Sequence, residues 1–174
     1  MLCNLTKQYV VDMLKKQGVK NMEIERKFLT KTVPFAWEVY PNQKISQCYI
    51  SMLPTIRLRQ MDTQYILTVK GKGHMAKEEF ELLLTQQEYI HLMQKAETPV
   101  LEKVRYKIPL ENGLTAELDI YKGHLQGLMT TEVEFSSVAQ AEAFVPPAWF
   151  GKEITEDIRY KNTHLSKYGI PDAD

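Results

Sequence analysis

The sequence has little of what marks secreted or membrane-spanning proteins. Its 174 residues include only two cysteines, Cys3 and Cys48, and neither belongs to a CxxC pair. Two isolated cysteines do not make the disulfide framework of a small secreted domain, so we expect a cytoplasmic protein. Every uninterrupted apolar run is far shorter than the roughly 20 residues that a membrane-spanning helix needs. Charged residues also interrupt the N-terminal segment where a secretory signal would require an apolar core.

The chain also has no excess of either charge. It carries 22 Lys+Arg and 22 Asp+Glu residues, which gives a formal net charge of +0. A balanced chain has no overall attraction to nucleic acid or to an anionic membrane, so we expect neither as a partner. Hydrophobic residues make up 44% and charged residues 25%, which is typical of a globular domain with one core.

Several catalytic motifs are missing as well. There is no GxxxxGKS/T phosphate-binding loop and no HExxH zinc motif, and the four histidines are scattered. Residues 71–76 match the loose GxGxxG/A pattern, but no strand–helix–strand unit follows them, which argues against a dinucleotide site. Cys48 is interpreted as a small buried residue rather than as a nucleophile.

The N-terminal residues are predicted to be an extension of the main domain. Apolar residues recur there at helical spacing: Leu5, Tyr9, Val10, Met13 and Leu14. This pattern predicts an amphipathic helix over residues 5–17 that packs on the domain or on a partner. Met22 directly precedes the first strand pattern. We therefore predict a helical extension over residues 1–21 and one domain over residues 22–174.

From residue 23 onward, charged and apolar residues alternate with a period of two, as they do in β-strands. Eight segments are predicted as antiparallel strands: 23–28, 45–51, 55–59, 65–70, 76–84, 101–108, 115–120 and 130–135. The fifth segment also has good helix propensity, but Gly71 and Gly73 favour a hairpin that joins it to the preceding strand. Helices are predicted over residues 86–96, 137–144 and 156–168, the last with Thr155 as its N-cap.

One face of the predicted strands is rich in charge. The charged positions are Glu23, Glu25, Lys27, Arg57, Arg59, Lys70, Glu79, Glu81, Lys103, Arg105, Glu117, Asp119, Glu132 and Glu134. On a single strand this alternation usually means one wet face and one buried face. Across the set, like charges recur two residues apart, as in Arg57 and Arg59, and would repel each other on an open surface. The predicted fold class is therefore α+β, a closed eight-stranded antiparallel β-barrel with a charged interior and several flanking helices.

The charges of this predicted interior indicate a ligand class. Carboxylate clusters without histidine or cysteine suit hard ions such as Mg²⁺ or Mn²⁺. Arginine and lysine suit phosphate oxygens, and buried charges must be paired or bind ions. Both signs of charge in one interior therefore predict a metal-bound polyphosphate, which is a small-molecule substrate.

The strand motifs resemble those of a known family. Residues 23–28 read Glu-Ile-Glu-Arg-Lys-Phe, an ExExK signature, and further motifs follow in order: Arg57-Leu58-Arg59, Glu79-Phe80-Glu81, Lys103–Tyr106, Glu117-Leu118-Asp119, Glu132–Phe135 and Thr155–Asn162. Together they resemble the CYTH superfamily, also called the triphosphate tunnel metalloenzymes, from about Met22 to Leu165. Within it the chain is most similar to the small bacterial inorganic triphosphatases.

The resemblance implies a metal-dependent hydrolase that splits inorganic triphosphate into pyrophosphate and phosphate by means of a metal-activated water. It implies two ions, Mg²⁺ or Mn²⁺. The implied metal ligands are Glu23, Glu25 and Glu134 for one ion, and Glu132, Asp119 and either Glu79 or Glu81 for the other. The implied phosphate-binding residues are Lys27, Arg57, Arg59, Lys70, Arg105 and Lys161. Glu25, Lys103 and Tyr49 are the implied catalytic residues, the last two acting on the leaving group or the water.

Three alternatives stay open at this point. Thiamine triphosphatases and class IV adenylyl cyclases of the family tend to carry an Asp-x-Tyr-Phe segment in the second strand, where this chain has Gln47–Ser51. That departure disfavours thiamine or nucleoside triphosphate hydrolysis and ATP cyclisation without excluding them. A non-catalytic polyphosphate-binding module is the third alternative. The oligomeric state, monomer or homodimer, is also left open.

Overall fold

A computed structural model describes residues 24–70 and 79–172 of the chain. The predicted helix over residues 5–17, Glu23 and the turn with Gly71 and Gly73 lie outside the described residues. The same holds for the side chains of Lys70 and Glu79, whose backbones are placed in strands.

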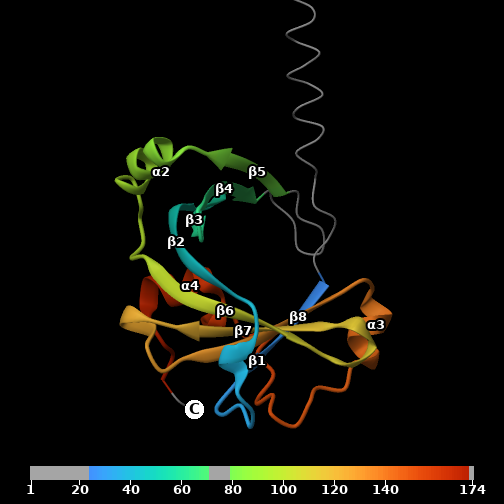
Figure 1. The fold of residues 1–174 in the computed structure, drawn as a ribbon. Helices are drawn as coiled ribbons and strands as arrows, with labels where there is room; N and C mark the ends of the chain where they lie inside the picture. The colour runs from blue at the N-terminus through green and yellow to red at the C-terminus, as the bar shows by residue number, and fades with distance from the viewer. Residues whose placement is uncertain (1–23, 71–78, 173–174) are drawn as a thin grey trace, which may run out of the picture.

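All eight predicted strands are present. They are β1 (Ile24–Leu29), β2 (Asn42–Met52), β3 (Thr55–Met61), β4 (Gln64–Lys70), β5 (Glu79–Leu84), β6 (Leu101–Pro109), β7 (Thr115–Tyr121) and β8 (Met129–Phe135). They form one antiparallel sheet in the order β1-β8-β7-β6-β2-β3-β4-β5. The sheet is strongly curved, so that β3, β4 and β5 arch over β6, β7 and β8 (Figure 1).

The predicted closure of the sheet into a barrel is not confirmed. In the described part of the chain β1 pairs with β8 alone and β5 pairs with β4 alone. Strands β1 and β5 are therefore the two edges of the sheet. Both edge strands carry a carboxylate on the inner face, Glu25 on β1 and Glu81 on β5. Closure would require β1 and β5 to pair with each other, and no such pairing is present among the described strands. The α+β architecture and the charged concave face stand without it.

Helix α2 (Gln86–Met93) covers the outer face of one half of the sheet. Tyr89 packs there with Cys48 and Leu58 in an apolar cluster, which agrees with the interpretation of Cys48 as a buried residue. The helix begins at Thr85, whose hydroxyl accepts from the Glu88 backbone N–H while the Glu88 carboxylate accepts from the Thr85 backbone N–H. This reciprocal capping box fixes the start of the helix.

Helix α3 (Val138–Ala143) covers the other half. Phe28, Val133 and Phe135 from the outer face of β1 and β8 pack against Ala141 of this helix and against Phe150. The outer faces are thus apolar and covered by helices, as predicted from the alternation. No described helix is long and apolar enough to cross a membrane.

The predicted helix over residues 156–168 is wrong in its first turn. The structure has a 3₁₀ turn, η4 (Ile158–Tyr160), followed by α4 (Asn162–Tyr168). Thr155 is not an N-cap, because its hydroxyl accepts from the Lys27 backbone N–H and donates to Glu153. Three further 3₁₀ turns are η1 (Trp37–Val39), η2 (Glu111–Gly113) and η3 (Gly123–Leu125). Gly169 ends α4 with φ of 83°, as expected for a helix terminus.

Helix α4 fills one end of the concave face. Leu165 of α4 packs in an apolar cluster with Leu101 and Tyr121, which are the terminal inward-facing residues of β6 and β7. Leu29 at the end of β1 packs against the same cluster. The charged residues are therefore confined to the remainder of the inner face.

Arg26 on β1 joins three segments on the outer side. Its guanidinium donates to the carbonyl oxygens of Ala141 and Phe144 and to the Glu153 carboxylate at 2.6 Å. The hydrogen bond from Arg26 lowers the pKa of Glu153. The pair is partly exposed, with 21% of the Arg26 side chain and 40% of the Glu153 side chain accessible, so its contribution to the free energy of unfolding is modest.

Because the pKa of Glu153 is lowered in the folded chain, the pair stabilises the fold above the ordinary carboxyl pKa and loses its effect as the pH falls through the lowered value. We predict that Glu153→Gln is less stable than wild type at pH 7 by up to about 1 kcal/mol. The two proteins should converge below the lowered pKa. Thermal unfolding at a series of pH values measures this, and a constant offset at every pH would contradict it.

Candidate active site

The inner face of β1, β7 and β8 forms an acidic wall. Its carboxylates are Glu25, Glu117, Asp119, Glu132 and Glu134. The register sets Glu25 opposite Glu134 and Lys27 opposite Glu132. It also sets Glu117 opposite Glu132 on the next pair of strands. Five carboxylates thus occupy neighbouring positions because period-two alternation places them on one side of each strand.

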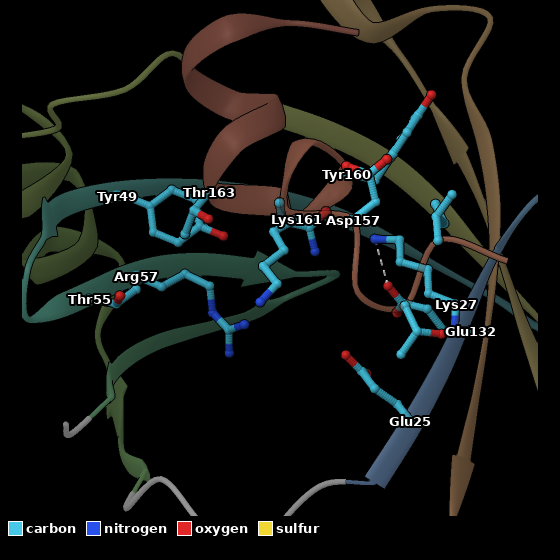
Figure 2. A pocket seen from close by; sticks show the side chains of 13 residues that line it. Glu25, Lys27, Tyr49, Thr55, Arg57, Glu132, Asp157, Tyr160, Lys161 and Thr163 are labelled. Atoms are coloured by element: carbon cyan, nitrogen blue, oxygen red, sulfur yellow. Dashed lines mark hydrogen bonds and ion pairs between the residues drawn. The ribbon is translucent and has the colours of Figure 1, made fainter. Parts of the chain in front are cut away.

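Two adjoining pockets, of about 290 and 390 Å³, lie on this inner side. The first reaches toward α4 and is lined by Lys27, Tyr49 and Lys161, and the second is lined by Arg59 and Arg105. Both share the residues Glu25, Arg57, Glu132 and Asn162. In Figure 2, Arg57 and Lys161 project into the same space as Glu25 and Glu132, from opposite sides. Most of the described side chains predicted for the site therefore converge.

Arg105 organises the acidic wall. Its guanidinium contacts three carboxylates, Glu117, Asp119 and Glu132, and Asp119 lies at 2.7 Å. Burial disfavours the charged form, but Asp119 and Glu132 outweigh it and raise the pKa of Arg105. One cation thereby holds carboxylates of two strands together.

Lys27 lies beside the same wall. Its ammonium is 2.9 Å from the Glu132 carboxylate, and both side chains are about nine-tenths buried. Burial alone would lower the pKa of Lys27, but Glu132 raises it overall. Burial alone would likewise raise the pKa of Glu132, but Lys27 and Arg105 hold it well below its usual value. Both groups are therefore charged at neutral pH.

Lys103 does not line either pocket. Its ammonium is buried beneath the wall, where it contacts the Asp119 carboxylate and lies 5.5 Å from the centre of the Tyr121 ring. Burial and Arg105 lower the pKa of Lys103 to about 8, although Asp119 opposes the shift. Lys103 therefore does not contact the cavity itself. It contacts Asp119, which in turn contacts Arg105, and Arg105 lines the cavity.

Arg57 and Arg59 on β3 form an arginine pair that faces the acidic wall. Arg57 donates to the Thr68 hydroxyl at 3.0 Å and lies 3.7 Å from the Glu81 carboxylate, while its Nε is buried without a hydrogen-bond partner among the described residues. Burial, Arg57 and Arg105 lower the pKa of Arg59 to about 10. Two like charges side by side and an unsatisfied N–H indicate a site that favours an anion.

Sequence reasoning missed two buried polar residues of the inner face, Gln47 on β2 and Thr68 on β4. Gln47 accepts from Arg59 and donates to Tyr49, and Thr68 accepts from Arg57 and donates to Glu81. The signal for both was available, because they occupy the inward positions of the same alternation as the charged residues. The predicted site comprised mainly charged residues, and these two neutral ones were not included.

The carboxylates suit a divalent ion that is held partly by the protein and partly by the oxygens of a bound anion. Among the described residues no group of three or more Asp, Glu, His or Cys side chains has the arrangement of a metal site. Asp119 and Glu132 are in contact with cationic side chains. Glu25 and Glu134, opposite each other and both lining the larger pocket, supply two carboxylates. Mg²⁺ is commonly held by one or two carboxylates together with phosphate oxygens, so these residues fit it.

Comparison with known proteins identifies the family. The inorganic triphosphatase of Nitrosomonas europaea is 43% identical over 148 residues, which cover 83% of this chain and 96% of that protein. This chain belongs to the inorganic triphosphatase family. The resemblance to CYTH proteins predicted from the motifs is thereby confirmed. No family model matches the sequence.

Solved structures share the architecture of this chain. The structure of the inorganic triphosphatase NE1496 has a TM-score of 0.66 at 39% identity and covers 86% of this chain and 97% of that one. A more distant structure, the adenylyl cyclase candidate HpAC1 from Hippeastrum, has a TM-score of 0.51 at 15% identity, with 70% and 83% coverage. The latter supports the fold alone.

The arginine pair predicts stabilisation by a multivalent oxyanion. Sulfate at constant ionic strength should raise the melting temperature of the wild type more than that of Arg57→Met, because the variant lacks half of the pair. At ten times its dissociation constant, a bound anion adds about 1.4 kcal/mol of stability. Lys44→Met, which removes an exposed cation elsewhere, should behave as wild type. Equal responses of wild type and Arg57→Met would contradict an anion site at the pair.

Proposed function

We propose that this chain hydrolyses inorganic triphosphate to pyrophosphate and phosphate with the help of Mg²⁺ or Mn²⁺. The observation that carries the proposal is the arginine pair, with Arg57 buried and Arg59 partly buried, that faces an acidic wall across a cavity. The pair suits phosphate oxygens, and the carboxylates suit the cation that accompanies them. The name of the Nitrosomonas europaea relative supports the same substrate.

The side chains divide the work by position. Arg57, Arg59 and Lys161 line the pockets and would hold phosphate oxygens, and Lys27 would contact them while paired with Glu132. Phosphoryl transfer needs chiefly positioning and charge neutralisation, which these cations supply. A bound divalent ion would add charge neutralisation and orient the phosphates. The water oxygen forms a bond to the terminal phosphorus, and the bond from that phosphorus to its bridging oxygen breaks. The bridging oxygen stays with the pyrophosphate leaving group, and the terminal phosphorus is released as phosphate.

Glu25 and Glu134 are the proposed principal ligands of the ion, and Glu23, whose structure is not described, is a further candidate. Asp119, Glu132 and either Glu79 or Glu81 remain the proposed ligands of a second ion. Lys70 remains a proposed phosphate contact. Lys103 is proposed to act by keeping Asp119 charged and Arg105 in place, since it contacts Asp119 and lies below the cavity. Tyr49, which lines the smaller pocket, is proposed to contact the substrate.

The activity is tested by release of phosphate from tripolyphosphate. We expect turnover with Mg²⁺ or Mn²⁺ and none after chelation with EDTA. ATP and thiamine triphosphate should react more slowly, and ATP should give no cyclic AMP. Binding of tripolyphosphate without turnover under either metal would instead favour a non-catalytic binding module.

Glu25→Gln should reduce turnover by about 100-fold or more, because it removes a carboxylate from the proposed ion while nearly preserving shape. Glu38→Gln, an equally small change at an exposed position of η1, is the matched control and should retain activity. Steady-state rates over a range of Mg²⁺ concentrations measure both variants. A Glu25→Gln enzyme with wild-type turnover and wild-type metal dependence would remove Glu25 from the proposed site.

A further inference from the structure

Gln47 is a fully buried polar side chain that lies next to two residues of the cavity, Arg59 and Tyr49. It lies on the inner face of β2, where the register sets it opposite Arg59 and sets Tyr49 opposite Arg57. Its amide contacts both neighbours on that face, Arg59 at 3.3 Å and the Tyr49 hydroxyl at 3.1 Å. One neutral residue therefore connects the arginine pair to the tyrosine.

The arginine fixes which way round the amide lies. A guanidinium has only donors, so the amide atom that faces Arg59 Nε must be the carbonyl oxygen. The amide nitrogen then faces Tyr49, and because that nitrogen can only donate, the Tyr49 oxygen must accept. The hydroxyl proton of Tyr49 is consequently directed away from Gln47.

The cavity is the place where this proton can find an acceptor. Tyr49 lines the smaller pocket together with Lys27 and Lys161. In residues 24–70 and 79–172, no side chain or backbone group accepts from the Tyr49 hydroxyl. Burial raises the pKa of Tyr49 in spite of Arg57 and Arg59, so the phenol keeps its proton at neutral pH. A phosphate oxygen, which can only accept, completes the arrangement.

We infer that Gln47 is a positioning residue, which orients the Tyr49 hydroxyl so that it donates to an oxygen of the bound polyphosphate. This inference rests on the proposed function and assigns a role to a residue that does not itself touch the substrate. Arg59 takes part because it holds the amide oxygen. The direction of the hydrogen bonds runs from Arg59 to Gln47, from Gln47 to Tyr49, and from Tyr49 to the phosphate.

Glu in place of Gln47 separates this role from a structural one. In Gln47→Glu the carboxylate still accepts from Arg59 and gains an ion pair, so the fold should retain its melting temperature. The carboxylate would also accept a hydrogen bond from the Tyr49 hydroxyl, which reverses the direction of the bond between the two side chains. The hydroxyl would then no longer donate into the cavity. We expect kcat and the affinity for tripolyphosphate to fall about tenfold, the scale of one lost hydrogen bond to a charged group. If Gln47 does not act through Tyr49, any loss in Gln47→Glu comes from the carboxylate offsetting the charge of Arg59, and the same loss should appear in a Tyr49→Phe background.

A double-mutant cycle with Tyr49→Phe tests whether Gln47 acts through the tyrosine. Tyr49→Phe should show a loss similar to that of Gln47→Glu, and the double variant should be no worse than Tyr49→Phe alone. Gln47→Met, which removes both hydrogen bonds, serves as a second single variant. Gln126→Glu, at an exposed turn, is the control for the added charge. Multiplicative losses in the double variant would overturn the inference.

Two measurements on the same proteins keep this test separate from the proposed function. Calorimetric titration with tripolyphosphate without metal reports binding, and phosphate release reports turnover. If the wild type binds but does not turn over, the proposed hydrolysis fails, while the binding cycle still decides on Gln47. If the wild type turns over and the cycle is multiplicative, only the inference fails. If the wild type does neither, both are overturned.

Discussion

The contact of Arg105 with Glu117, Asp119 and Glu132 is the interaction on which the site depends. Buried carboxylates on adjacent strands repel one another, and a sheet that collects them on one face needs a cation within it. A guanidinium suits this place because its donors lie in a plane and can reach several carboxylates at once. With Lys27 on the other side of Glu132, the three carboxylates Glu117, Asp119 and Glu132 of the acidic wall are paired with cations. Glu25, Glu134 and the arginine pair line the cavity and are placed to bind a ligand and its ion.

The period-two alternation accounts for most of what could be predicted. It located all eight strands and separated the faces correctly, because a strand allows a side chain only two directions. It also brought Glu25, Arg57, Arg59 and Glu132 to one cavity. These predictions needed no long-range information beyond the assumption of a single curved sheet.

The remainder depended on contacts between distant segments. Closure of the sheet could not be read from the strands, because it depends on how β1 and β5 meet. The first turn of the last helix failed because Thr155 hydrogen-bonds to Lys27, far away in sequence, instead of capping. Lys103 was expected in the cavity by its strand position, but Asp119 and Tyr121 hold it beneath the wall.

The apolar packing of Leu165 against Leu101 and Tyr121 bounds the charged part of the inner face on the side of α4. This boundary lies directly beside a buried ion pair, because the Lys103 ammonium is 5.5 Å from the centre of the Tyr121 ring and contacts Asp119. Closely packed apolar side chains resist rearrangement, so they also hold their ionic neighbours in place. The position of the charged groups is therefore set in part by side chains that carry no charge.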